Sequence, residues 1–190
     1  MKLKETKELF QNELAGLYDF EEIDSFFYIL IEHYLGLKRI ALALKPEISC
    51  SKEDLESILK DLESSKKQIP IQYILGETEF FGLPFKVNSH VLIPRPETEE
   101  LVDWILNFEK SESVNNGLKI LDIGTGSGCI AVSLAKNFNH AYVYALDVSH
   151  DALEVAKRNA TLNNVSVEFI EADILNLETW NTAFKNLKFD

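Results

Sequence analysis

Three glycines at alternate positions follow an apolar, strand-like run in ILDIGTGSGCIAVSLA, residues 120–135. Such glycines turn the chain tightly and let a ligand approach the backbone closely. A dinucleotide-binding loop would have the spacing GxGxxG, but here the third glycine falls one position early, which disfavours NAD and FAD. The predicted cofactor loop consists of Gly124, Thr125, Gly126, Ser127 and Gly128.

Two aspartates follow the next two strand-like runs. Asp147 ends AYVYALD, 23 residues after Gly124, where a carboxylate at a strand tip can accept hydrogen bonds from ribose hydroxyls. Asp173 ends IEAD, where its carboxylate can accept a hydrogen bond from the adenine amine. Either Asp122 or Asp173 alone is also explained as a strand-end or capping residue. Polar features after three successive strands together predict a nucleoside cofactor.

Two cysteines are present, and neither predicts a reactive site. Cys50 and Cys129 fall in segments that we assign to separate domains, so a disulfide is not expected and a reducing compartment fits. Neither forms a metal-binding pattern with the four histidines. Because no basic residue adjoins Cys129, we interpret it as a small buried helix residue rather than a nucleophile.

The elements that position these residues follow from hydrophobic periodicity. After residue 117, LKILDIG, CIAVSLAKNF, AYVYALD, SHDALEVAKRNATLNN and VSVEFIEAD alternate between strand and helix patterns. This order predicts a parallel sheet with right-handed crossovers, the first half of a Rossmann-like α/β domain.

The preceding residues have a different pattern. Apolar spacings of three and four before residue 70 predict a small helical bundle, in which Asp24 caps the second helix and SKED, residues 51–54, caps a later one. From Pro70 the sequence is rich in extended-chain residues and is broken by glycine and proline, which predicts a β-hairpin linker. The expected domains are 1–69, the helical bundle; 70–93, the linker; and 94–190, the α/β domain.

Composition limits the function. The chain has 190 residues and a formal charge of -12, which argues against a broad phosphate-binding surface and favours a basic partner over nucleic acid, although acidity that serves only solubility is the alternative. No apolar run approaches the roughly 20 residues of a membrane span. No signal peptide is evident, so we expect a cytoplasmic location. Nothing in the sequence predicts an obligate dimer.

Longer motifs resemble a known family. DIGTGSG followed by ALD is similar to the cofactor motifs of class I S-adenosylmethionine-dependent methyltransferases. PIQYILGETEFFGLPFKVNSHVLIPRPETEELVDWIL, followed by KILDIGTGSGCIAVSLAK, resembles the PrmC/HemK family of release-factor glutamine methyltransferases over residues 70–175. The resemblance implies methyl transfer from S-adenosylmethionine, giving S-adenosylhomocysteine, to the side-chain amide nitrogen of the glutamine in the Gly-Gly-Gln loop of class I peptide chain release factors.

The resemblance also implies roles for individual residues. The glycine loop, residues 124–128, would contact the methionine moiety, Asp147 the ribose, and Asp173 with Ile174 the adenine. The family's Asn-Pro-Pro-Tyr loop, which aligns the substrate amide, is absent from these 190 residues. We therefore expect no catalytic residue in this chain, and we expect a chain of this exact length to be inactive.

The segment PRPETEEL, residues 94–101, keeps two interpretations open. Pro96 suits the first turn of a helix, and glutamates there interact favourably with the helix dipole. The resemblance instead places the segment beside the cofactor, with Thr98 and Glu99 as the expected contacts. Two functional alternatives also remain: a nucleic-acid exocyclic-amine methyltransferase, and a non-catalytic binding module on a methyltransferase scaffold.

Overall fold

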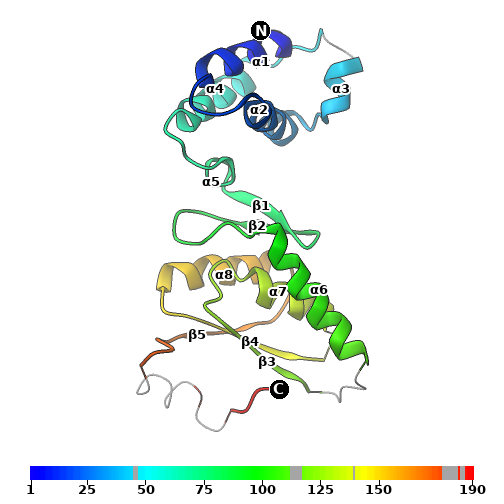
Figure 1. Cartoon of the computed structure of the whole chain (residues 1–190), viewed down its shortest axis with the longest axis vertical. Coiled ribbons are helices and arrows are strands. Elements are labelled where there is room, and N and C mark those ends of the chain that lie inside the picture. The colour runs from blue at the N-terminus through cyan, green and yellow to red at the C-terminus, as the bar shows by residue number, and fades with distance from the viewer. Residues whose placement is uncertain (45–46, 112–116, 139, 177–183, 185–186) are drawn as a thin grey trace. The chain divides into compact units, whose positions relative to one another are not determined.

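The structure is a computed structural model that describes residues 1–44, 47–111, 117–138, 140–176, 184 and 187–190. The chain forms two compact units, Met1–Leu75 and Gly76–Asp190 (Figure 1). We describe each unit by itself.

The first unit is the predicted helical bundle. A single apolar cluster, which includes the fully buried Phe10, Phe27 and Ile58, packs its helices together. Ser51 accepts a hydrogen bond from the backbone N–H of Asp54, as the capping pattern predicted. The helices are α1 (Leu3–Leu14), α2 (Phe20–Leu35), α3 (Arg39–Leu44), α4 (Lys52–Ser65) and α5 (Ile71–Leu75).

The prediction that Asp24 caps the second helix is wrong. Helix α2 begins earlier, and its N-cap is Asp19, whose carboxylate accepts a hydrogen bond from the N–H of Glu22. Asp24 instead lies within the helix, where it is buried and bonded to α1. A carboxylate suits both positions, so the sequence alone did not distinguish them.

The start of the expected extended linker is also different. Residues Ile71–Leu75 form α5, in which the N–H groups of Tyr73 and Ile74 donate to the carbonyl of Pro70. Ile71 is buried in the core of the helical unit. Tertiary packing therefore outweighs the β-propensity of this isoleucine-rich segment.

The second unit begins with the predicted hairpin. Strands β1 (Glu77–Phe80) and β2 (Leu83–Lys86) pair antiparallel, with Phe80 opposite Leu83. The two turn residues, Phe81 and Gly82, both have positive φ, at 52° and 70°. Positive φ at both central residues is the geometry that suits a two-residue hairpin turn.

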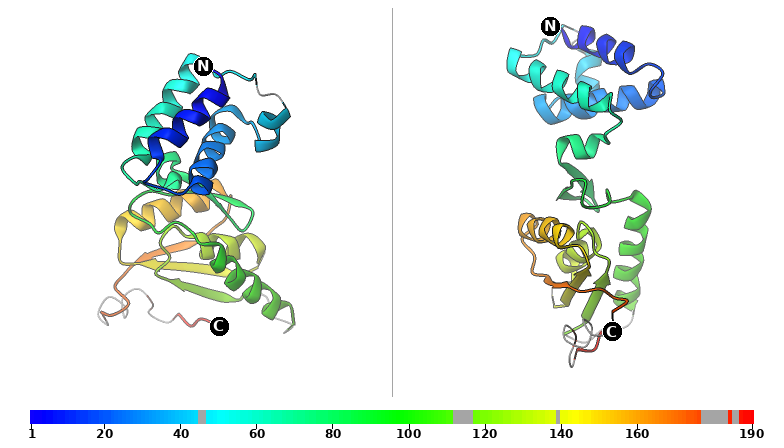
Figure 2. Two further views of the ribbon diagram at one scale, coloured as in Figure 1. Left: turned by 45° about the horizontal axis from the view of Figure 1, so that its top comes forward. Right: turned by 90° about the vertical axis from the view of Figure 1, so that its left-hand side faces the viewer.

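The remainder of this unit is the predicted incomplete Rossmann-like fold. Three parallel strands lie in the order β3-β4-β5, and the carboxyl end of each strand lies at the same edge. Helices α7 and α8 lie side by side over one face of the sheet, and α6 packs against α7 (Figures 1 and 2). The elements are α6 (Pro96–Ser111), β3 (Lys119–Ile123), α7 (Cys129–Asn137), β4 (Tyr142–Asp147), α8 (His150–Leu162) and β5 (Glu168–Glu171).

Two kinds of feature are absent from the described residues. Within the described ranges, no helix is long and apolar enough to cross a membrane. The same ranges hold no group of three or more His, Cys, Asp or Glu side chains that could bind a metal ion.

Candidate cofactor site

The glycine loop is tied to the neighbouring strand. It starts where β3 ends, and the N–H groups of Gly124 and Thr125 both donate to the carbonyl of Leu146 in β4, at 2.8 and 2.9 Å. Among the described residues, no heavy atom outside each glycine and its two chain neighbours lies within 4 Å of the position that a Cβ on Gly124 or Gly126 would occupy. The loop is therefore fixed through its backbone, while the space beside these two glycines is open to a ligand.

The third glycine has a packing role. Gly128 has a φ of 79°, and a Cβ there would lie 3.0 Å from the Cβ of Ala156 in α8. It directly precedes α7. Gly128 thus allows α7 and α8 to approach closely at the base of the loop.

The carboxylate of Asp147 is hydrogen-bonded to the glycine loop. Its Oδ2 accepts a hydrogen bond of 2.9 Å from the N–H of Gly126, and its Oδ1 accepts one of 2.9 Å from the N–H of Ser149. Each carboxylate oxygen can accept more than one hydrogen bond. Asp147 can therefore bind ribose hydroxyls without releasing the loop.

Asp122 is also hydrogen-bonded to this loop. Its Oδ2 accepts a hydrogen bond of 2.7 Å from the hydroxyl of Thr125. Burial raises the pKa of Asp122, the hydrogen bonds from Thr125 and from the backbone of Ala131 oppose that rise, and the nearby charge of Asp147 adds to it. Two acidic groups therefore share this loop, and their combined charge favours a cationic ligand.

Cys129 has the environment of a structural residue. Burial raises the pKa of its thiol to about 11, although a hydrogen bond involving Ser127 lowers it in part. A thiol with such a pKa stays protonated at neutral pH and is a poor nucleophile. This favours the interpretation of Cys129 as a small helix residue.

Asp173 and Ile174 lie at the same edge of the sheet. Both are partly buried and follow β5 by two and three residues. Asp173 accepts hydrogen bonds from the N–H groups of Leu175 and Asn176, and the N–H of Ala172 donates to the carbonyl of Asp147. Parallel pairing thus brings the predicted adenine-side residues to the edge that carries Asp147.

Two exposed apolar residues at this edge were not identified from the sequence. Ile123 ends β3 and Val148 follows β4, and their exposed fractions are 50% and 68%. Apolar surface at this point could cover part of a nucleoside. The sequence did not indicate that these two residues are exposed, because an apolar residue at a strand end is ordinarily assigned to the core.

The segment PRPETEEL, residues 94–101, supports the structural alternative for one of its residues. Helix α6 begins at Pro96, as expected. The Oε1 atom of Glu99 accepts a hydrogen bond of 2.8 Å from the N–H of Phe81 in the hairpin turn. The N–H of Thr98 donates to the carbonyl of Arg95. The contact described for Glu99 is therefore with the hairpin, and a cofactor contact by either residue stays a prediction.

The structure adds a residue that sequence reasoning missed. Asn159 of α8 is fully buried; its Oδ1 accepts from the N–H of Lys86 at 2.6 Å, and its Nδ2 donates to the carbonyls of Lys86 and Ser127, both at 2.9 Å. Asn159 therefore links β2 to the glycine loop. Asn163, one turn later, donates to the carbonyl of Pro84.

A signal for both asparagines was present in the sequence. Asn159 lies four residues after Val155 and three after Ala156 on the buried stripe of α8, and Asn163, the C-cap of that helix, lies four residues after Asn159. A polar residue on an apolar helix stripe needs a buried hydrogen-bond partner, so its position on the stripe predicts a structural hydrogen bond.

The comparisons with known proteins match separate families to the two units of the chain. Residues 114–190 match the model of a methyltransferase domain, and residues 7–76 match the PrmC N-terminal domain. The second unit is therefore part of a methyltransferase domain. With both domains in this order, the chain is similar to the PrmC family.

Two curated relatives show the same similarity. The chain is 52% identical over 187 residues to the release factor glutamine methyltransferase of Flavobacterium psychrophilum, covering 97% of this chain and 65% of the relative. It is 42% identical over 151 residues to the enzyme of that name from Chlorobaculum tepidum, covering 77% and 51%. The chain thus spans between about half and two thirds of the length of these relatives.

One solved structure is also similar. A Pyrococcus abyssi tRNA (uracil-54, C5)-methyltransferase in complex with S-adenosyl-L-homocysteine is 28% identical, with a TM-score of 0.41, over 51% of this chain and 23% of that one. A TM-score this low adds nothing to the family assignment.

Proposed function

We propose that the protein containing this chain transfers a methyl group from S-adenosylmethionine to the side-chain amide nitrogen of a glutamine. The glutamine is that of the Gly-Gly-Gln motif in class I peptide chain release factors. The observation that carries the proposal is the 52% identity, over 97% of this chain, to a protein named release factor glutamine methyltransferase.

The residues present fit the cofactor. The open space beside Gly124 and Gly126 admits the methionine moiety against the loop backbone, and Asp147 has acceptor capacity left for the ribose. Asp173 and Ile174 border the adenine. When bound, S-adenosylmethionine supplies an electrophilic methyl group on a cationic sulfonium.

The chain's own residues orient and stabilise that group. Asp122 and Asp147 place negative charge beneath the loop, which favours the cation over neutral molecules of the same shape. An amide nitrogen is a poor nucleophile, so most of the catalytic effect must come from alignment with the methyl group. We assign that alignment to the family's Asn-Pro-Pro-Tyr loop, outside these 190 residues, and we propose that this chain alone is inactive.

The three domains expected from the sequence would have different roles. We propose that residues 1–69 help to dock the release factor, that residues 70–93 link the docking domain to the site, and that residues 94–190 bind the cofactor. A release factor works in translation, so we propose the cytoplasm as the location. We propose a monomer, and the net charge of -12 supports a protein substrate over nucleic acid.

A methyl-transfer assay tests the proposal. The full-length protein is incubated with radiolabelled S-adenosylmethionine and a class I release factor, with a Gln→Ala variant of the release factor's Gly-Gly-Gln motif, or with RNA or DNA. We expect label on the intact release factor alone. Label on nucleic acid would favour the exocyclic-amine methyltransferase, and absence of cofactor binding would favour the binding module.

A further inference from the structure

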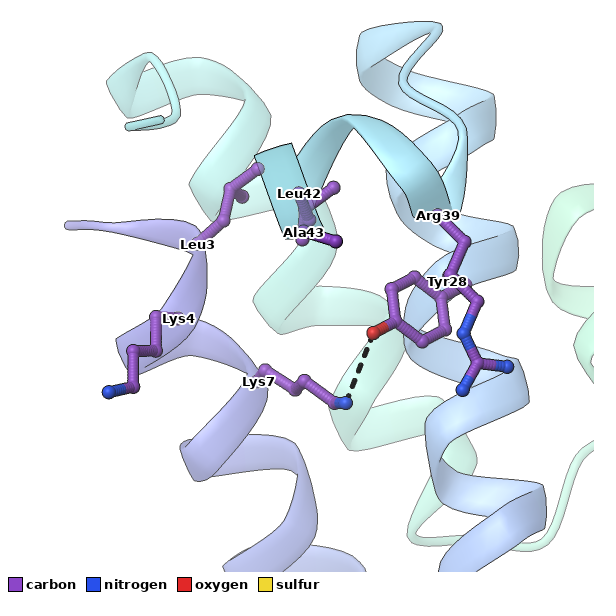
Figure 3. Close-up of a pocket in the computed structure, with 7 residues that line it drawn as sticks. All are labelled: Leu3, Lys4, Lys7, Tyr28, Arg39, Leu42 and Ala43. Atoms are coloured by element: carbon purple, nitrogen blue, oxygen red, sulfur yellow. Dashed lines mark hydrogen bonds between the residues drawn. The ribbon is translucent and has the colours of Figure 1, made fainter. Parts of the chain in front are cut away.

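The helical unit contains a pocket that the proposed methyl transfer does not use. It has a volume of about 370 Å³ and lies among α1, α2 and α3 (Figure 3). Its lining residues are Leu3, Lys4, Lys7, Tyr28, Arg39, Leu42 and Ala43. One part of the lining is therefore apolar, and every charged side chain in it is basic.

Tyr28 organises the polar side of the pocket. Lys7 Nζ donates to the Tyr28 hydroxyl oxygen at 3.1 Å and to Asp24 Oδ2 at 2.7 Å. The Arg39 guanidinium carbon lies 4.7 Å from the centre of the Tyr28 ring, a cation–π distance. The aromatic ring and its two cations thus form a preassembled group.

The charges of this group are not balanced. Asp24 forms an ion pair with Lys7, and its charge also acts on Arg39, although the structure gives Arg39 no carboxylate within 4 Å among the described residues. Residues 1–75 contain 14 Asp and Glu against 10 Lys and Arg, so a basic pocket runs against the composition around it. Two cations thus share one carboxylate, and the Arg39 guanidinium can bind a further anionic group through two parallel hydrogen bonds.

Helix α3 supplies an apolar surface beside this cation. Its sequence is RIALAL, it has no buried residue, and Ile40 and Leu44 are 67% and 75% exposed. Leu42 and Ala43 face the pocket with Leu3 (Figure 3). An apolar helix that contributes so little to its own core gains from being covered by another protein.

We propose that the pocket and α3 form a docking subsite for the protein substrate, which takes an apolar side chain next to an Asp or Glu. This rests on the proposed function, in which the helical unit docks a release factor. The apolar side chain packs on Leu3, Leu42 and Ala43. The carboxylate binds Arg39, and the Tyr28 hydroxyl can donate a hydrogen bond to the same carboxylate.

The matched control is Lys4. It carries the same charge as Arg39 and lines the same pocket, but its ammonium group points away from Tyr28 (Figure 3). Both side chains are exposed, so neither substitution should unfold the unit. Thermal melting of Arg39→Gln and Lys4→Gln checks this point.

The test is steady-state kinetics of the full-length enzyme with intact release factor. We expect Arg39→Gln to raise KM for the release factor about tenfold, the lower end of the scale for losing a hydrogen bond to a charged group, with kcat and cofactor affinity unchanged. Lys4→Gln should change KM less than about twofold, because exposed charges outside direct contacts contribute little. A short peptide that carries only the Gly-Gly-Gln loop should be methylated equally by Arg39→Gln and the wild type.

Each other outcome has a defined meaning. An unchanged KM for Arg39→Gln, while the wild type methylates release factor, overturns the docking subsite alone. An equal KM effect in Lys4→Gln replaces the subsite with a general charge effect. If the wild type binds the cofactor but methylates only nucleic acid, the proposed function and the docking subsite both fail.

Discussion

The two units differ in the partners of their aspartate and asparagine side chains. In the helical unit, side chains of different helices bond to one another: Lys7 and Gln11 donate to Asp24, and Tyr34 donates to Asp61. In the second unit, the main partners are backbone groups, as with Asp147 at Gly126 and Asn159 at Lys86 and Ser127.

This difference has a functional consequence. Bonds between side chains fix how helices pack, which would suit the docking role that we propose for residues 1–69. Bonds from side chains to backbone fix the shape of a loop and leave its outer surface bare. The candidate cofactor loop is therefore shaped through its backbone, by side chains that bond to it from within the fold.

The largest effect should come from Asn159→Ala. It removes three buried hydrogen bonds and leaves the N–H and carbonyl of Lys86 and the carbonyl of Ser127 without this partner. We expect a loss of about 3 kcal/mol in the free energy of unfolding, together with weaker cofactor binding. Urea denaturation and calorimetry measure the two effects.

Asn163→Ala is the matched control for that variant. Asn163 also binds the hairpin, through the carbonyl of Pro84, and it donates to Asn159 O, but its described bonds do not reach the loop. It should cost stability with little change in cofactor affinity. Equal losses of affinity in both variants would show that the hairpin, and not the bond to Ser127, shapes the loop.

Gly128→Ala should have the next largest effect. Its φ of 79° is strained for alanine, and the new Cβ would meet Ala156 at 3.0 Å. We expect a loss of about 2–3 kcal/mol from strain and overpacking. Gly126→Ala, at a φ of 54° with open space around it, should lose only about 1 kcal/mol. Chemical denaturation compares them, and a reversed order would contradict the packing role of Gly128.

Asp24 and Asp61 should affect stability in opposite directions. Burial alone would raise the pKa of Asp24, but the hydrogen bonds from Lys7 and Gln11 bring it below its ordinary 3.8. Its stabilising contribution is present above that pH and is lost as the pH falls through the lowered pKa. Asp24→Asn should therefore cost about 1 kcal/mol at pH 7 and nothing at low pH.

Burial raises the pKa of Asp61 despite the hydrogen bond from Tyr34. Its charge therefore costs stability as the pH rises above 3.8 and through the raised pKa. Asp61→Asn should be as stable as the wild type at low pH and up to about 1 kcal/mol more stable at pH 7. Urea titrations between pH 3 and 7 measure both variants, and parallel pH curves would refute the distinction between the two aspartates.

The smallest effect concerns the cysteines. Burial raises the pKa of Cys129 to about 11 and also raises that of Cys50. Alkylation by iodoacetamide at pH 8 should be slow for both thiols and slowest for Cys129. Mass spectrometry gives the two rates, and rapid labelling of Cys129 would return it to the list of candidate nucleophiles.

Much of the fold was predictable because it rests on local periodicity. The alternation of strand and helix patterns after residue 117 predicted the parallel sheet, and the glycine spacing predicted the loop. The prediction of an extended segment at Ile71 was wrong because the helix there depends on burial against a core distant in sequence, which no local pattern indicates. The prediction of a helix cap at Asp24 was wrong because a capping carboxylate and a buried, paired carboxylate look alike in sequence.

The candidate site was predictable only in part. Residues that face a ligand, such as Asp147, follow from their place at a strand end. Asn159 joins backbone groups that lie 73 and 32 residues away in the chain, so its role depends on tertiary structure. Glu99 shows the reverse case, because a residue expected at the cofactor has its described bond with the hairpin turn.

Calorimetric titration of S-adenosylmethionine into the full-length protein tests the central claim most directly. Asp147→Ala removes the predicted ribose ligand and the bond to Gly126, so we expect at least about a tenfold loss of affinity. Glu99→Ala tests the predicted cofactor contact of Glu99 separately: a loss of affinity would support that contact, and wild-type affinity would leave Glu99 with its bond to the hairpin. Wild-type affinity in Asp147→Ala would contradict the assignment of this loop as the cofactor site.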